Sequence, residues 1–294
     1  MNSDLTRRAL LALILLVLVT GAPSLLATEE KQKDAAQANE QATATQKEEA
    51  RDDDQEGRLY LPSDDAMADL AATLAEAEAQ NKLALVILGA NWCHDSRGLA
   101  ARLQVEPLKS LVNTHYETLY VDVGDLSKGR DVIQSLGVPL FYATPTVLIV
   151  DPISRKLVNA GNRHIWARAD SVSMEDSVSY FEEIANIDLA TLPDEDSYTE
   201  EQAQLMNDID EFELAQAQRL SDAYIITGAM IGGTFDREVW DEVASFRFQL
   251  ATDVDDLRAE VARRVANGET DIVLTYPQYP DWTWDGDTKP GDEQ

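Results

Sequence analysis

The side chain best suited to nucleophilic chemistry is that of Cys93, because it is the only cysteine in the chain. It lies in the segment Asn91-Trp92-Cys93-His94-Asp95-Ser96-Arg97, directly after the apolar run Leu83–Leu88. A thiolate can attack a disulfide, but one thiol alone cannot close a disulfide within its own chain. The sequence therefore excludes a stabilising intramolecular disulfide. Two interpretations of Cys93 remain: a reactive thiol, or a small apolar residue buried beneath a turn.

The sequence does not predict metal or cofactor chemistry, so no metal site and no cofactor are expected. The histidines have no metal-ligand spacing with the cysteine; they are His94, His115 and His164. A hydrolase pair of Cys93 with His164 has no flanking signature to support it. One acidic cluster lacks the glycine and the terminal glutamate of a calcium loop, and we interpret it as a helix-capping cluster; it comprises Asp253, Asp255 and Asp256.

The elements that must position Cys93 are a strand before it and a helix after it. The continuous apolar run Leu83–Leu88 predicts a buried central strand. A helix is expected from about Ser96 to Thr114, with a kink at Pro107, because proline removes an amide donor. Cys93 then lies at a helix N-terminus, where free amides and the helix dipole favour a thiolate.

The pattern Trp92-Cys93-x-x-Ser96 at a strand-to-helix turn resembles the active-site turn of the thioredoxin superfamily, with Ser96 in place of the second cysteine. A second matching feature is Thr144-Pro145, just before the apolar strand Val147–Val150. The resemblance implies an α/β, thioredoxin-like fold with a central mixed sheet flanked by helices. It also implies that Cys93 and Ser96 are catalytic, that Pro145 follows a cis peptide bond, and that Trp92, Thr144 and Pro145 bind substrate. The alternative for Pro145 is an ordinary proline at the start of a strand.

The sequence departs from the family pattern at Pro139–Ala143, an insertion that lengthens the loop before Thr144. Two functions are compatible with the resemblance. The first is monothiol thiol–disulfide exchange or isomerisation through Cys93, with release by a substrate cysteine or an external thiol. The second is a non-catalytic thioredoxin-fold module that binds proteins. A third alternative assigns the function to residues 192–294 and leaves the thioredoxin-like unit as a scaffold.

Four segments are expected along the chain. Residues 1–27 are expected to be a signal peptide or an N-terminal anchor, because two arginines precede a short apolar run. Residues 28–57 are predicted to form a disordered acidic linker, and residues 58–191 the thioredoxin-like domain. Residues 192–294 are predicted to be an acidic, mostly helical region.

Hydrophobic spacing predicts the remaining elements of the chain. Within 58–191 we expect helices at 64–80, 131–136 and 174–187, and strands at 117–123, 146–150 and 156–158, the last two as a hairpin. Beyond residue 192 we expect three helices, centred on 205–220, 239–250 and 254–265, and a strand at 271–276. The aromatic tail that follows is expected to fold back over an apolar groove; it comprises Tyr276, Tyr279, Trp282 and Trp284.

The formal net charge is −30, and more than half of this excess falls within residues 192–294. Such acidity argues against nucleic acid and anionic membrane surfaces as partners. The expected partner is a cysteine-containing protein or a small thiol, and a membrane tether is expected only through the N-terminal segment. From this leader we expect a location outside the cytoplasm, in the periplasm.

Overall fold

A computed structural model describes residues 58–284, of which residues 59–284 belong to one compact unit. The predictions of a leader at 1–27 and a linker at 28–57 concern residues outside this range. Within the described part of the chain, no helix is both long and apolar enough to cross a membrane.

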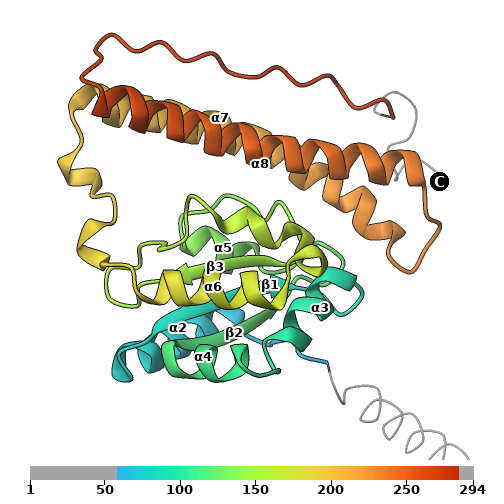
Figure 1. The fold of residues 1–294 in the computed structure, drawn as a ribbon. Helices are drawn as coiled ribbons and strands as arrows, with labels where there is room; N and C mark the ends of the chain where they lie inside the picture. Colours follow the sequence, from blue (N-terminus) through green and yellow to red (C-terminus); the bar gives the residue numbers. More distant parts are fainter. Residues whose placement is uncertain (1–57, 285–294) are drawn as a thin grey trace, which may run out of the picture. The chain divides into compact units, whose positions relative to one another are not determined.

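The centre of the fold is a mixed sheet of three strands in the order β2-β1-β3 (Figure 1). The middle strand β1 (Leu83–Gly89) pairs in parallel with β2 (Tyr116–Asp122) and antiparallel with β3 (Thr146–Val150). Val86 on β1 lies opposite Leu119 on one side and Leu148 on the other. The predicted strands at these three places are confirmed, and so is the thioredoxin-like, mixed α/β architecture.

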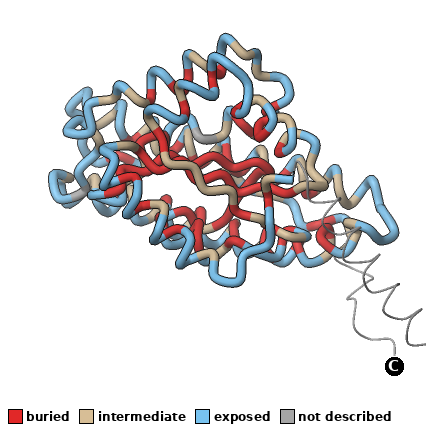
Figure 2. The backbone as a smooth tube through the Cα atoms, turned by 90° about the horizontal axis from the view of Figure 1, so that it is seen from below, coloured by how far each residue is buried: buried red, intermediate tan, exposed pale blue. Residues whose placement is uncertain are grey.

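Alternate residues of β1 feed two separate apolar cores, one on each face of the sheet, and Figure 2 shows this buried layer running through the unit. Val86 and Leu88 face the core that contains α2 and α5, whereas Leu85 and Ile87 face the core that contains α3, α4 and α6. Because both faces are covered, the strand is apolar at every position, as expected for a central strand. The flanking helices are α2 (Ala66–Ala79), α3 (His94–Arg102), α4 (Leu108–His115), α5 (Arg130–Ser135) and α6 (Met174–Ala185).

The helix predicted from Ser96 to Thr114 is wrong in one respect, because the structure breaks it into α3 and α4 instead of kinking it. Helix α3 ends at Arg102, and α4 begins at Leu108, directly after Pro107. Pro107 has no amide hydrogen to donate and stands as the N-cap residue of α4; the Glu106–Pro107 peptide bond is cis. The short α3 therefore carries the cysteine turn by itself.

Beyond residue 192 the structure has two long helices instead of the three that were predicted. They are α7 (Glu200–Met230) and α8 (Arg237–Ala266), which lie side by side as an antiparallel pair (Figure 1). The predicted second and third helices are one continuous helix, because no glycine or proline separates Leu250 from Val254 and both side chains face the same core. We call α7 and α8 together the C-terminal hairpin.

The interpretation of the acidic cluster in α8 as a helix cap is also wrong, since the three aspartates lie inside the helix. Asp253 accepts a hydrogen bond of 2.7 Å from the hydroxyl of Tyr279, and Asp255 lies 3.4 Å from the His164 ring. The cap at the start of α8 is Asp236, whose carboxylate accepts bonds from two backbone amides.

The aromatic tail folds back on the C-terminal hairpin, as predicted. Tyr276 packs on Phe212 of α7, and Tyr279 and Trp282 both pack on Phe246 of α8. The strand predicted at 271–276 does not form: this segment is extended but has no strand partner among the described residues. The two helices hold its backbone instead: the Ile272 amide donates to Glu201 of α7 at 2.8 Å, and Arg264 of α8 donates to the Val273 carbonyl at 3.1 Å.

The hairpin strand predicted at 156–158 is also absent among the described residues. Only one bridge forms there, between Val150 and Leu157, because Asp151 accepts amide bonds from Ile153 and Ser154 and closes a tight turn. The chain then enters the 3-10 helix η1 (Arg163–Ser171), which no sequence pattern predicted. Two further 3-10 turns, η2 (Leu189–Thr191) and η3 (Glu195–Ser197), lead into α7.

Candidate functional site

Cys93 lies at the junction between the end of β1 and the start of α3. It is the N-cap residue of α3, with extended backbone, and its side chain makes no capping bond to the helix. The thiol is partly exposed. The free amides of the first turn and the positive end of the helix dipole therefore lie at the base of a thiol that solvent can reach.

The loop that faces this thiol is Thr144-Pro145, and the peptide bond between them is cis, as the resemblance implied. The Cys93 thiol donates a hydrogen bond to the Thr144 carbonyl, with a sulfur–oxygen distance of 3.0 Å. The Thr144 hydroxyl in turn donates to the Cys93 sulfur at 3.4 Å. The structure thus brings together two segments that are 51 residues apart.

Ser96, the residue in place of a second cysteine, points into the interior and not into the open site. Its side chain is fully buried. Within residues 58–284 its hydroxyl makes no hydrogen bond of ordinary geometry, and it lies against Gly89 at the end of β1. A side chain on Gly89 would approach this hydroxyl to 2.8 Å, so only glycine fits there.

Tyr60 is a component of the site that the sequence analysis missed. Its ring is buried, and its hydroxyl donates to the backbone carbonyl of Ser96 at 3.2 Å. Asn91 donates its side-chain amide to the Tyr60 carbonyl at 2.6 Å, so Tyr60 is attached to both sides of the cysteine turn. Burial raises the pKa of the Tyr60 phenol far above its usual value, and Tyr120 and Cys93 raise it further. The only sequence signal for Tyr60 was its position at the start of the ordered chain.

Trp92 forms the wall of the site next to the thiol. Its indole N–H donates to the carbonyl of Gly124, in the turn after β2, at 2.8 Å. Its ring packs edge-on against Trp240 of α8, with 6.4 Å between ring centroids. The sequence analysis placed Trp240 in the helix predicted around 239–250 but gave it no place in the site.

The histidines contact carboxylates and do not gather around the thiol. His94 lies 3.9 Å from Asp170, on η1, and His164 lies 3.4 Å from Asp255, on α8. No group of three or more possible metal ligands occurs between residues 58 and 284.

The inserted segment before the cis bond attaches the C-terminal hairpin to the site. Tyr224 of α7 stacks on Phe141 and donates its hydroxyl to the Phe141 carbonyl at 2.9 Å. Tyr142 donates its hydroxyl at 2.7 Å to Glu213, which is buried and paired at 2.6 Å with Arg258 of α8. Burial disfavours the charged form of Arg258, but the neighbouring carboxylates raise its pKa above the usual value. The loop that carries Thr144 is thus fixed by the hairpin.

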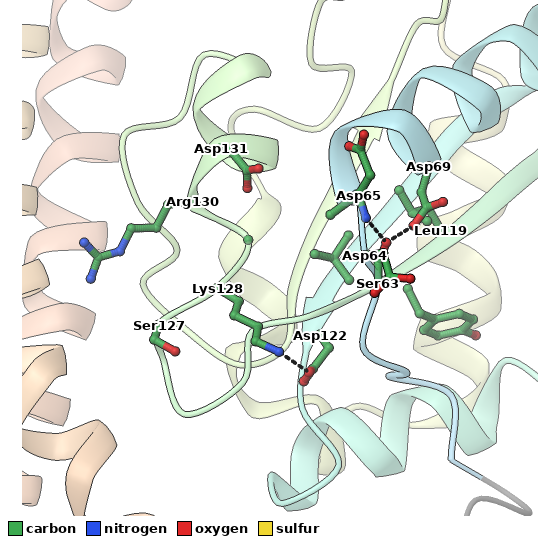
Figure 3. A pocket seen from close by; sticks show the side chains of 14 residues that line it. Ser63, Asp64, Asp65, Asp69, Leu119, Asp122, Ser127, Lys128, Arg130 and Asp131 are labelled. Atoms are coloured by element: carbon green, nitrogen blue, oxygen red, sulfur yellow. Dashed lines mark hydrogen bonds and ion pairs between the residues drawn. The ribbon is translucent and has the colours of Figure 1, made fainter.

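A depression of about 470 Å³ lies beside α2 and the end of β2, and none of its lining residues belongs to the cysteine site (Figure 3). Several of its polar side chains have structural partners. Asp65 caps α2, Asp69 accepts a bond from Ser63, and Lys128 lies 4.0 Å from Asp122. Arg130 extends from it toward α7, where it donates to the Ser221 carbonyl at 3.4 Å. No cysteine lines this depression.

No curated protein matches the chain. The solved structure of a disulphide isomerase from Xylella fastidiosa Temecula1 matches with 27% sequence identity over 44% of this chain and 100% of its own, with a TM-score of 0.39. A family model described as thioredoxin-like matches residues 65–152, the part that contains the three strands, Cys93 and the cis Thr144–Pro145 bond. Residues 65–152 of this chain form a thioredoxin-like domain.

Proposed function

We propose that this protein carries out thiol–disulfide exchange, with Cys93 as a monothiol nucleophile. The thiolate attacks one sulfur of a substrate disulfide. A new bond forms between Cys93 Sγ and that sulfur as the old disulfide breaks, and the second substrate sulfur leaves as a thiolate.

One observation carries the proposal: the sulfur lies between the N-terminus of α3 and the loop with the cis bond. The amides of the first turn of α3 lie on one side of the sulfur, and on the other side Thr144 contacts it twice, with its hydroxyl donating at 3.4 Å and its carbonyl accepting the thiol proton at 3.0 Å. A merely structural cysteine needs neither the partial exposure nor a hydroxyl donor.

The second half of the cycle must use a thiol from outside the chain, because Cys93 is the only cysteine. If a substrate cysteine attacks the mixed disulfide, Cys93 returns as a thiolate and the substrate keeps a rearranged disulfide, with no net oxidation. If an external thiolate attacks the substrate sulfur instead, Cys93 is also released and the disulfide passes to the external thiol. Both routes fit a cysteine-containing protein as substrate, and the second fits a small thiol as partner.

The test is the reaction of the folded protein with dithiodipyridine, a neutral small disulfide, followed by release of thiopyridone and by mass. We expect one adduct on the native protein and none on Cys93→Ala. Thr144→Val should react roughly tenfold more slowly, because the sulfur loses a hydrogen-bond donor worth about 1.4 kcal/mol. Thr118→Val, the same change on β2, should react at the native rate.

The proposal is refuted if Cys93 reacts only after unfolding. A folded but unreactive protein would instead support the alternative, a thioredoxin-fold module that binds proteins without turnover. The absence of a second thiol is the observation that favours this alternative.

We further propose that the protein is exported and acts outside the cytoplasm, in the periplasm. The support is the sequence of residues 1–27, where Arg7 and Arg8 precede an apolar run. Fractionation of cells that express the full chain tests this, and recovery in the cytoplasmic fraction would contradict it.

A further inference from the structure

The tip of the C-terminal hairpin adds two aromatic side chains to the wall beside the reactive thiol. Trp240, in the first turn of α8, packs against Trp92, and Phe235, just before α8, packs against Trp240 at 5.4 Å between centroids. We call Trp92, Trp240 and Phe235 the aromatic strip. Phe235 at its outer end is 48% exposed, and both tryptophans are only partly buried.

The strip is held at the site by contacts on both of its sides. Trp92 directly precedes Cys93 and is fixed by its bond to the Gly124 carbonyl. On the hairpin side, Gly228 of α7 allows the carbonyl of Asp125 to approach so closely that a Cβ there would lie 2.2 Å from it. The turn that fixes Trp92 is therefore in direct contact with the hairpin that carries Trp240.

Charged side chains of both signs surround the strip. Asp125, Glu238 and Asp241 are all exposed, on the turn after β2 and on the first turns of α8. Three cations of the described segment lie close by. Arg237 is over the Phe235 ring at 5.5 Å and 3.8 Å from Asp241. Lys128 packs against Gly124, and Arg97 donates to the Asn91 carbonyl at 2.6 Å. Among the residues that the structure describes, Asp125 and Glu238 form no ion pair, so these two carboxylates can accept basic groups of a ligand that covers Phe235.

We propose that the aromatic strip is the recognition surface for a polypeptide substrate whose reacting cysteine is flanked by an aromatic side chain and by Lys or Arg. This inference rests on the proposed function only in that the substrate reacts at Cys93. The aromatic side chain stacks against Phe235 and Trp240, and the basic residues lie against the surrounding carboxylates. A small anionic thiol would gain neither contact.

The test compares three peptides of equal length, each carrying its cysteine as a mixed disulfide with thiopyridine. One has Phe and Lys around the cysteine, one has Ala and Lys, and one has Phe and Glu. We expect the first to react fastest with the full chain. Phe235→Ala should slow it by about three- to tenfold, to the rate of the Ala peptide. Glu238→Lys should reduce the preference for Lys over Glu, and added salt should do the same.

Two controls separate this inference from the proposed function. Ile153→Ala removes another exposed apolar side chain, 75% exposed and in the turn after β3, and should leave all three rates unchanged. The second control measures binding of the labelled, disulfide-free Phe/Lys peptide to Cys93→Ser, which cannot exchange. Binding that weakens with Phe235→Ala sustains the recognition surface even if the native chain proves inert toward disulfides. Exchange that is equal for all peptides and unaffected by Phe235→Ala overturns the inference and leaves the exchange function intact.

Discussion

For Gly228→Ala, helix propensity and tertiary packing predict changes of opposite sign in the free energy of unfolding. Gly228 lies inside α7, where replacing glycine by alanine ordinarily stabilises a protein by about 1 kcal/mol. In this fold the new Cβ would lie 2.2 Å from the carbonyl oxygen of Asp125, whereas ordinary contacts of carbon need roughly 3.5 Å. The obstacle is backbone and cannot rotate away, so the hairpin must move by more than 1 Å.

The expected cost comes from this forced movement. Overpacking costs about 1–3 kcal/mol, and we take the upper end because neither partner is a flexible side chain. After subtraction of the gain in propensity, Gly228→Ala should lower the free energy of unfolding by about 2 kcal/mol. Hydrogen exchange should also rise in residues 138–143, which attach the hairpin to the cysteine site.

The assay is urea denaturation of the full chain, with Ala229→Gly as the matched control. Ala229 is the next residue of α7 and is exposed, so its replacement reports propensity alone and should cost about 1 kcal/mol. If propensity governed both positions, Gly228→Ala would stabilise by the amount that Ala229→Gly destabilises. A stability equal to or above that of the native chain would refute the close approach of α7 to Asp125.

Three further predictions concern buried polar groups. Glu213→Gln removes the charge that Arg258 faces at 2.6 Å and should cost about 3 kcal/mol in urea denaturation, whereas a change below about 1 kcal/mol would contradict the buried pair. Tyr60→Phe keeps the ring but removes the bond to the Ser96 carbonyl, and should cost about 1 kcal/mol; an unchanged midpoint would remove Tyr60 from the site. Burial raises the pKa of Tyr60 and of Tyr116, where Tyr180 adds to it, so both phenols stay protonated in the folded state. Unfolded tyrosines lose their protons near pH 10, so the contribution of these two phenols to the free energy of unfolding should be fully present below about pH 10 and fall as the pH rises above it. A free energy of unfolding that does not change from about pH 9 to 11 would contradict this.

Local sequence predicted an element correctly where the residues of that element alone determine its structure. The run Leu83–Leu88 predicted β1 because a strand covered on both faces must be apolar throughout. The same reasoning failed at Pro107, because the missing amide donor of proline is compatible with a kink and with a break, and only the surrounding packing selects between them. In α8 it failed because aspartates that resemble a cap were instead bonded by residues far along the chain, Tyr279 and His164.

The sequence by itself determined the chemistry that this protein can attempt. The chain has one thiol, between a buried strand and a helix, and Ser96 follows it three residues later. This thiol can attack a disulfide, but the chain has no second cysteine that could resolve the mixed disulfide. Residue type and short-range spacing suffice for that conclusion, because they need no partner from elsewhere in the chain.

Tertiary structure alone decided what surrounds the thiol. Tyr60, which bonds the Ser96 carbonyl, precedes Ser96 by 36 residues. Trp240, which packs on Trp92, follows Cys93 by more than a hundred residues. The inserted loop before Thr144 has a role only once Tyr224 and Glu213 pack on it. Such contacts depend on how two cores and a hairpin fit together in space, and no local periodicity encodes that fit.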